Sequence, residues 1–415
     1  MAVTSNDDGY KNLNLDGEIP RLEDYDVSPK YAFMSENPLR TLPDYFEPWW
    51  TIATRLPELV ENRTLRDEVN KMPLLDFRRL NSEAEWRLAH VILNAITQCY
   101  VWMAGEKNIP RSIPETIAVP FYEVAELLGI TPSCSQFNGV LANWKLIDKN
   151  GPVNADNMTT IIDLVGGEDQ VWFFMISAQV EMDFAPAVLG ILQAQQAVKD
   201  LDVIKYTAAL EKVQKALRQM KVSLSRMKER CRPRVFYNVL RPFVAGWDSP
   251  PFLDKKWKGL IYEGVSPEPL CYGGGSAAQS STLPCIDAAL GITHEPAEVK
   301  LSEKFQKCML PKHRNFIKAL ANGPSIRHFA TYCKNSRALR AYNDTLQAVV
   351  DFRSFHLTIV TNYVIIQSKQ EDTNKLFTMQ AALGSGGTGF MRFLKNLRSS
   401  VRESFYCYDE GTEIN

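Results

Sequence analysis

The chain has 415 residues, of which 45% are hydrophobic and 23% are charged, a composition typical of a soluble globular protein rather than a disordered or fibrous one. At this length we expect two or three domains. The 47 basic and 48 acidic side chains give a net charge of −1. This balance argues against a nucleic-acid-binding protein, because such proteins usually carry a basic excess or stripe.

The first residues and the cysteines predict where the protein resides. Residues 1–9 lack the basic start and apolar stretch of a signal peptide, and no run approaches the ~18 apolar residues of a membrane span. The eight cysteines form no C-x-x-C pair, which argues against a structural zinc site, covalently attached haem and a disulfide framework. We therefore expect a cytoplasmic protein whose cysteines are mostly buried.

The N-terminal half predicts an arm followed by several helices. The first forty residues are polar and interrupted by prolines, which indicates an extended arm over the surface. Helical periodicity follows at 46–61 and at 82–105, and shorter helices are expected at 121–129 and 133–146. Residues 150–172 then change to small, acidic, turn-forming types. We place the boundary between two domains there.

The C-terminal half gives a stronger helical pattern. Residues 173–198 are apolar enough for one buried helix, and 206–230 form an amphipathic helix that ends before Pro233. A Gly- and Ser-rich stretch at 262–284 precedes helices at 301–322, 336–369 and 389–404. Alternating strand patterns are scarce. We predict an all-α fold with an N-terminal arm that is disordered or extended (1–19), a small N-terminal domain (20–164), a large helical domain (165–408) and a tail (409–415).

Residues 384–389 read Gly-Ser-Gly-Gly-Thr-Gly and fit the G-x-G-x-x-G pattern of dinucleotide-binding proteins. That function requires a strand before the motif and a second strand after it. The preceding segment is polar, and too few residues follow for a βαβ unit. Two interpretations remain open: a loop whose backbone approaches a ligand closely, and a flexible surface loop.

Histidine is scarce, so mechanisms that need several histidines have few candidates. His90 lies on an amphipathic helix, where a hydrogen-bonded core histidine is the simplest interpretation. His294 and His313 lie in polar sequence contexts, and we expect both to be exposed. His328 stands near a helix start, and His356 lies in a long apolar helical segment.

The surroundings of His356 favour a special role. On a helix, Phe352, Ile359 and Tyr363 share its face at −4, +3 and +7, and Arg353 lies three residues before it. One imidazole on an apolar face with a cation one turn away suits haem, since histidine binds iron, the apolar face covers porphyrin and a guanidinium can reach a propionate. A hydrogen-bonded core histidine remains the alternative.

Other catalytic patterns are missing from the sequence, which contains no H-E-x-x-H, no E-x-x-H pair and no G-x-S-x-G elbow. Arg241 is the next candidate, because Leu240 and Arg241 follow Phe236 at helical spacings of four and five in a segment bracketed by prolines. A guanidinium beside aromatic rings can bind a carboxylate while the rings pack on a flat ligand. The alternative is a surface arginine whose stem covers apolar residues.

Six strings together resemble the indoleamine 2,3-dioxygenase family. They are Val-Leu-Ala-Asn-Trp (140–144), Phe-Tyr-Asn-Val-Leu-Arg (236–241), Gly-Gly-Ser-Ala-Ala-Gln-Ser-Ser (274–281), Pro-Lys-His-Arg-Asn-Phe (311–316), Phe-Arg-Ser-Phe-His-Leu-Thr-Ile-Val-Thr (352–361) and Gly-Ser-Gly-Gly-Thr (384–388). The resemblance covers about residues 20 to 404. It implies an all-α protein with a small N-terminal domain over a large domain that holds haem b.

The resemblance also implies the reaction. Members of this family cleave the indole C2–C3 bond of L-tryptophan with O₂ to give N-formylkynurenine, the first step of the kynurenine pathway. Both oxygen atoms enter the product, so no NAD(P)H is consumed, although a reductant must keep the haem iron ferrous. We accordingly expect L-tryptophan or a related indoleamine and O₂ as partners, no nucleic acid or membrane, and a monomer.

The resemblance assigns roles to individual residues. His356 would be the proximal ligand of the haem iron, and the cofactor would also contact Phe352, Arg353 and Ser276. The catalytic set would be Ser177, Phe236 and Arg241, with Arg241 pairing with the substrate carboxylate. The remaining substrate contacts would come from the distal wall (Phe173), the loop that passes over the haem (Gly275, Ser276 and Ala277) and the loop that closes on the substrate (Ser385 and Gly386).

Three positions depart from the family pattern. Gln136 and Gly139 stand where the mammalian enzymes have tyrosine and cysteine, which predicts a distal pocket of different shape. Tyr237 replaces a second phenylalanine. Gastropod molluscs use a myoglobin derived from this family for oxygen storage, and such a protein is the alternative function; a helical scaffold without haem is a third. The Phe236–Arg241 pair favours the enzyme, because oxygen storage has no use for a carboxylate clamp.

Overall fold

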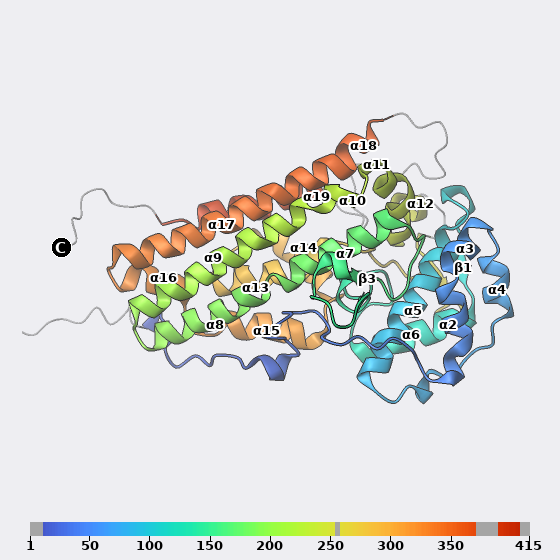
Figure 1. Cartoon of the computed structure of the whole chain (residues 1–415), viewed down its shortest axis with the longest axis horizontal. Coiled ribbons are helices and arrows are strands. Elements are labelled where there is room, and N and C mark those ends of the chain that lie inside the picture. The colour runs from blue at the N-terminus through green and yellow to red at the C-terminus, as the bar shows by residue number, and fades with distance from the viewer. Residues whose placement is uncertain (1–10, 254–257, 371–388, 407–415) are drawn as a thin grey trace, which may run out of the picture.

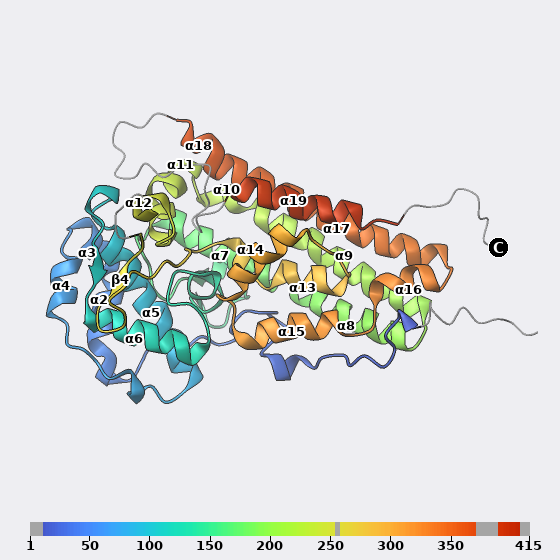
Figure 2. The ribbon, with the colours of Figure 1, turned by 180° about the vertical axis from the view of Figure 1, so that it is seen from behind.

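The computed structural model describes residues 11–253, 258–370 and 389–406 (Figure 1). Two long helices, α9 (Val203–Ser225) and α17 (Ser336–Val360), run side by side along the molecule, and a group of shorter N-terminal helices lies at one end (Figures 1 and 2). Within the described residues the strands are four pairs of residues: β1 (Ser112–Ile113), β2 (Lys145–Leu146), β3 (Met158–Thr159) and β4 (Ile261–Tyr262). The prediction of an all-α fold is confirmed.

The N-terminal helices surround α5 (Glu83–Trp102). Ser82 caps this helix by accepting a hydrogen bond from the Glu85 backbone N–H at 3.2 Å, and every residue from Leu88 to Trp102 is buried. The expected helix at 46–61 divides at Arg55, two residues before Pro57, and the helix expected at 121–129 begins earlier, directly after Pro114. The surrounding helices are α2 (Glu47–Thr54), α3 (Leu56–Glu61), α4 (Leu65–Lys71) and α6 (Glu115–Leu128).

The helix expected at 133–146 is wrong. The segment forms a single π-helical turn, Phe137–Leu141, and then enters β2, which pairs with β3 in antiparallel orientation. Asn138 gives the physical reason: its Oδ1 accepts from the Ser135 N–H at 2.9 Å and its Nδ2 donates to the Ser133 carbonyl at 2.9 Å. A side chain that bonds the preceding backbone competes with regular helix formation.

The single helix expected at 173–198 is two helices, α7 (Glu168–Met182) and α8 (Ala185–Lys199). The break falls before Pro186, which lacks a backbone N–H and is favoured in the first turn of a helix. This stretch is the one part of the described chain long and apolar enough to cross a membrane. Its apolar window is 61% buried within the protein, as a core helix is.

The remaining helices follow the predicted ranges with three changes. The range 206–230 divides at Arg226 into α9 and a short helix, α10 (Met227–Arg230). The range 301–322 holds two helices, α14 and α15, because Pro311 starts the second, and the range 336–369 contains a π-helical turn, η10 (Thr361–Ile365), after α17. The other elements are α11 (Pro233–Val235), the π-helical turn η7 (Phe236–Leu240), the 3₁₀ helix η8 (Arg241–Val244), α12 (Pro250–Leu253), the 3₁₀ helix η9 (Ala277–Gln279), α13 (Thr282–Ala289), α14 (Pro296–Gln306), α15 (Pro311–Ala321), α16 (Ile326–Tyr332), α18 (Ile366–Ser368) and α19 (Phe390–Glu403).

The described part of the N-terminal arm packs on the distant turn between α15 and α16. Leu13 is fully buried and its carbonyl accepts from the Ser325 N–H at 2.8 Å, while Asn14 Nδ2 donates to the Asn322 carbonyl at 2.6 Å. The arm thus joins the start of the described chain to a turn in its C-terminal half. A division into domains near residue 164 remains a prediction.

Two histidines differ from expectation. His313 is buried, not exposed: its ring packs 5.0 Å from the Phe33 ring and its Nε2 lies 3.1 Å from the Asp26 carbonyl oxygen. His294 is also mostly covered, with 13% of its side chain exposed. The polar sequence around both residues misled the prediction, because the distant residues Phe33 and Asp26 cover His313, and Asp287 contacts His294. His90 is buried between the rings of Phe121 and Phe137, as expected for a core histidine.

The buried histidines predict the pH dependence of stability. Burial lowers the pKa of His90 to about 3 and that of His313 to about 4. In the unfolded chain histidine titrates near 6.5. The contribution of these two histidines to the free energy of unfolding should therefore be complete above about pH 6.5. It should fall as the pH drops toward 4, since only the unfolded chain binds these protons. His90→Gln should reduce this slope by about 1.4 kcal/mol per pH unit, measured by urea unfolding. An unchanged slope would contradict the buried, neutral His90.

Candidate functional site

Three elements meet at the site predicted from the sequence: α7, the segment that contains η7, and the helical run of α17 and η10. The Phe173 ring of α7 lies 4.7 Å from the Phe236 ring of η7, centroid to centroid, and Phe236 lies 5.8 Å from the ring of Tyr363. Tyr363 follows His356 by seven residues and donates its hydroxyl to the Cys231 carbonyl at 2.7 Å. The structure thus brings Phe173 and Phe236 together beside the helix of His356.

His356 lies near the end of α17, with Phe352 buried one turn before it. Its ring makes no hydrogen bond to any residue that the structure describes. Burial, followed by the charge of Arg353, lowers the pKa of His356 to about 4. The imidazole is therefore neutral at neutral pH, which is the form that ligates a metal ion. This favours the iron-ligand interpretation over a hydrogen-bonded core histidine.

Arg353 is 4% exposed and belongs to a buried ion pair that the sequence did not reveal. Its Nη2 donates to Asp287 Oδ2 at 2.6 Å, and the same oxygen lies 2.9 Å from His294 Nε2. Burial opposes ionisation of Asp287, but the charge of Arg353 and the contact with His294 outweigh it, so the pKa of Asp287 is lowered. The Arg353 Nε has no hydrogen-bond partner among the described residues. One buried donor thus remains available to an anionic ligand group, as the propionate hypothesis requires.

Arg241 begins η8, directly after the π-helical turn that carries Phe236. Only 3% of it is exposed, so the interpretation as a surface arginine is wrong. Its guanidinium carbon lies 5.1 Å from the Tyr237 ring centroid, within the range of a cation–π contact. Burial lowers its pKa, and Tyr237 and Glu106 oppose that shift. A buried guanidinium beside aromatic rings suits recognition of a carboxylate.

The small-residue loop of Gly275, Ser276 and Ala277 lies against the segment that follows Arg241. The Gly275 N–H donates to the Val244 carbonyl at 2.8 Å. Ser276 caps η9: its hydroxyl accepts from the Ala278 N–H at 3.2 Å, and the Gln279 side chain accepts from the Ser276 N–H at 3.1 Å. These bonds hold the loop predicted to pass over the haem close to Arg241.

Two glycines make this close approach between backbones possible. A Cβ on Gly246 would lie 2.1 Å from the Gly274 nitrogen, and a Cβ on Gly274 would lie 2.3 Å from the Gly246 nitrogen. Neither position can carry a side chain without separation of the two segments. A Cβ on Gly275 would lie 3.0 Å from Cys134 Sγ. The loop therefore depends on small residues for its place, which fits a segment that lies close to a flat cofactor.

Ser177 lies one turn after Phe173 on α7. Its Oγ donates to the Phe173 carbonyl at 2.8 Å, so the helix itself uses the hydroxyl proton. One turn further, the buried Glu181 accepts hydrogen bonds from Gln136 Nε2 at 3.0 Å and Thr282 Oγ1 at 2.6 Å, and burial raises its pKa. Gln136 therefore links α7 to the N-terminal helices, a role that its sequence context did not suggest.

Gly139 adjoins a small enclosed cavity. A Cβ there would lie 3.1 Å from Phe174 Cε1, so the phenylalanine ring occupies the space that a larger residue at 139 would need. The cavity has a volume of about 10 Å³, roughly the room of one water molecule, and its lining includes Asn94, Cys134, Gly139 and Phe174. The predicted loop residues Ser385 and Gly386 lie outside the described residues.

The fold and the site define a helical protein with a histidine that has no hydrogen-bond partner among the described residues, a glycine-dependent loop, two packed phenylalanines and a buried arginine directly after the turn that carries one of them. A sequence model of the indoleamine 2,3-dioxygenase family matches residues 21–404. The chain is 37% identical to mouse indoleamine 2,3-dioxygenase 2, over 94% of this chain and 97% of that protein.

Two further relatives show the range of the similarity. The chain is 36% identical to rat indoleamine 2,3-dioxygenase 1, over 93% of this chain and 96% of that protein. It is also 34% identical to the myoglobin of the abalone Haliotis madaka, over 92% of this chain and 98% of that protein. The chain belongs to the indoleamine 2,3-dioxygenase family.

The close approach of Gly246 and Gly274 leads to a test of the loop. Gly246→Ala should destabilise the protein by about 1–3 kcal/mol, the usual cost of an overpacked position. Urea unfolding would measure this. Gly389→Ala is the control, because a Cβ there meets nothing within 4 Å. Equal stability of the two variants would contradict the described packing of residues 244–246 on 272–275.

Proposed function

We propose that the protein is a haem b dioxygenase that adds O₂ across the indole C2–C3 bond of L-tryptophan to give N-formylkynurenine, the first step of the kynurenine pathway. The observation that carries the proposal is the aromatic pair Phe173 and Phe236, together with the buried Arg241 at the end of the turn that carries Phe236. This combination offers faces for a flat ring and a cation for a carboxylate, which are the two ends of tryptophan. Membership of the family supports the same reaction.

Haem b would supply the iron at which O₂ reacts with the indole ring. His356 would ligate that iron, because its ring is neutral and has no hydrogen-bond partner among the described residues. Phe352 would pack on the porphyrin, and Arg353 and Ser276 would bind its polar edge. The small residues Gly275 and Ala277 would let the loop lie close to the cofactor and substrate.

The remaining residues would bind and orient the substrate. Arg241 would pair with the tryptophan carboxylate, and Phe173 and Phe236 would hold the indole ring and exclude water, so that the reacting atoms stay at short distance. Ser177, whose hydroxyl donates to the helix, would present oxygen lone pairs to a donor in the site. Ser385 and Gly386 would belong to the loop that closes on the substrate. A reductant would keep the iron ferrous, and the protein would act as a cytoplasmic monomer without nucleic acid or membrane partners.

Oxygen storage is the second candidate, because the chain is 34% identical to an abalone myoglobin. The same haem and the same histidine would serve that function. The difference lies at Arg241, since a buried guanidinium close to aromatic rings suits a carboxylate, which tryptophan carries and O₂ does not. The buried Arg241 therefore favours the enzyme.

The cofactor proposal predicts the behaviour of His356→Ala. The wild-type protein reconstituted with haem should show one haem per chain and a Soret band, and the variant should lose the band or shift it, because the iron loses its protein ligand. Absorption spectroscopy and haem titration measure both. A protein without a Soret band, or a variant identical to wild type, would contradict every haem-based function.

The substrate proposal predicts a selective loss in Arg241→Ala. Tryptophan binding should weaken by about 2–5 kcal/mol, or at least roughly 30-fold, because the carboxylate would lose its buried partner. Haem content should stay at the wild-type level. N-formylkynurenine formation by the ferrous protein with L-tryptophan and O₂ is the measurement, with the exposed Arg402→Ala as control. Unchanged turnover would refute the clamp, and stable oxygenated wild-type protein without product would favour oxygen storage.

A further inference from the structure

An ion pair between Asp169 and Arg232 lies outside the substrate site. It joins α7 to the segment that carries Phe236, and these two segments form the site. Asp169 lies in the first turn of α7 and is 5% exposed. Its Oδ1 accepts from the Arg232 backbone N–H at 2.6 Å, and Arg232 Nε lies 3.0 and 3.1 Å from the two carboxylate oxygens. Arg232 Nη2 donates to Oδ2 as well. One carboxylate therefore binds both the main chain and the guanidinium of the same residue.

Each member of this ion pair lies four residues before one of the two aromatic residues of the site. Asp169 precedes Phe173 by four residues on α7, and Arg232 precedes Phe236 by four residues on the facing segment. The Phe236 N–H donates to the Arg232 carbonyl at 2.9 Å. A shift of Arg232 relative to Asp169 would therefore change the distance between the Phe173 and Phe236 rings.

The residue next to Arg232 is fixed from the other side. The Cys231 carbonyl accepts the Tyr363 hydroxyl at 2.7 Å, and Tyr363 belongs to the helical run of His356. Residues 231 and 232 thus bind α7 through Asp169 and η10 through Tyr363. All three elements of the site depend on this short segment.

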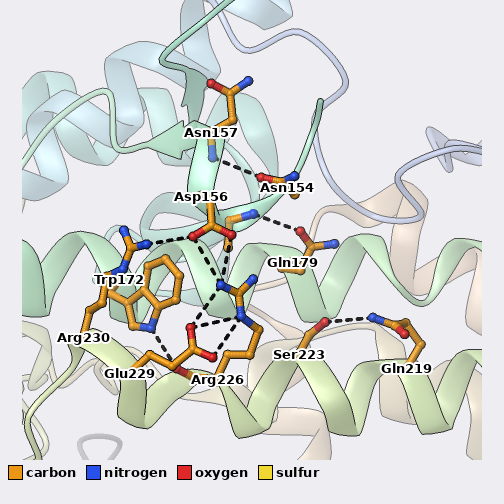
Figure 3. Close-up of polar contacts among 11 residues, drawn as sticks. Asn154, Asp156, Asn157, Trp172, Gln179, Gln219, Ser223, Arg226, Glu229 and Arg230 are labelled. Atoms are coloured by element: carbon orange, nitrogen blue, oxygen red, sulfur yellow. Dashed lines mark hydrogen bonds and ion pairs between the residues drawn. The ribbon is translucent and has the colours of Figure 1, made fainter. Parts of the chain in front are cut away.

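A second set of contacts prevents α7 from adjusting freely (Figure 3). Trp172 Nε1 donates to the Arg226 carbonyl at 2.9 Å, and the guanidinium carbons of Arg226 and Arg230 lie 5.1 and 4.3 Å from the Trp172 ring. Asp156 accepts from Arg226 Nη2 at 2.9 Å and from Arg230 Nη2 at 2.8 Å. These contacts attach α7 to the end of α9 and to α10. They therefore hold α7 in place, so that it cannot follow a movement of the segment that carries Phe236.

We propose that Asp169 is a positioning residue for the substrate site, which sets tryptophan affinity by fixing the segment of Phe236 and Arg241 against α7 without touching the substrate. This inference rests on the proposed function. Most of the Arg232 side chain is exposed, at 74%, so water can hydrate its charge when the partner is lost. The consequence of losing Asp169 is therefore misplacement of the main chain rather than an unpaired buried cation.

The test is Asp169→Asn in the haem-reconstituted full chain. The asparagine keeps one oxygen for the Arg232 N–H but places an NH₂ group against the guanidinium donors. Titration of the ferric protein with L-tryptophan, followed by the Soret band, gives the dissociation constant without turnover. We expect it to rise about tenfold, since a misplacement of about 1 Å can cost up to 100-fold. KM should rise more than kcat falls, with haem content and the resting Soret band unchanged.

Asp76→Asn is a matched control. Asp76 binds the backbone N–H of Arg78 at 3.1 Å and its Nε at 2.7 Å, the same pattern of contacts, but in an exposed turn of the N-terminal helices. It should leave the tryptophan dissociation constant at the wild-type value. An equal rise in both variants, or no rise in Asp169→Asn, would overturn the positioning role.

Arg232→Gln provides a second variant that keeps the bond between the Arg232 backbone and Asp169. It should raise the dissociation constant less than Asp169→Asn, and the double variant should show less than the product of the two fold-changes, because both act through one contact. Multiplicative effects would overturn the proposal. A wild-type protein whose Soret band ignores tryptophan would instead refute the proposed function, so the two failures are distinguishable.

Discussion

The packing of Phe173 against Phe236 is the contact on which the site depends, because it joins two helical segments that are sixty residues apart in sequence. Its geometry follows from main-chain anchors on both sides: Arg232 bonds Asp169, and Cys231 accepts a bond from Tyr363. Aromatic rings at this separation gain about 0.5–1.5 kcal/mol beyond their burial. That energy alone would not fix the separation of the two segments. The surrounding hydrogen bonds are directional, so they define the distance between the two rings, which apolar packing alone would leave variable.

Three π-helical turns occur in the described chain, and they lie around α7: two of them contact α7, and the third contacts the turn that carries Phe236. Phe137–Leu141 contains Gly139, Phe236–Leu240 contains Phe236, and Thr361–Ile365 contains Tyr363. A π-helical turn adds a residue to the helix and rotates the side chains that follow. Such turns are unfavourable in isolation and persist where packing supports them. π-helical turns are frequent at functional sites, and the position of these three around α7 agrees with the proposed site.

Much of the fold could be predicted, because apolar periodicity and prolines mark most of the helices. The errors have local causes. Asn138 bonds the backbone and prevents the helix expected at 133–146, and Pro186 divides the helix expected at 173–198. The site was less accessible to sequence reasoning, since Asp287, Glu181 and Asp169 act through partners 45 to 101 residues away. No local pattern announces such a partner, whereas the spacing of His356 and its apolar neighbours did indicate an unusual helix face.

The two buried arginines distinguish the functions that this fold can serve. Arg353 is neutralised within the protein by Asp287, an arrangement equally useful to an oxygen carrier and an enzyme. Arg241 lies over the Tyr237 ring in a segment that also carries Phe236, and burial lowers its pKa. A protein that only stored O₂ would gain stability by replacing such a residue with an apolar one, because buried ionic groups are often costlier than well-packed hydrophobic residues. Its place directly after the turn that carries Phe236 suits a ligand with a carboxylate, and of the two candidate functions only the cleavage of tryptophan binds one.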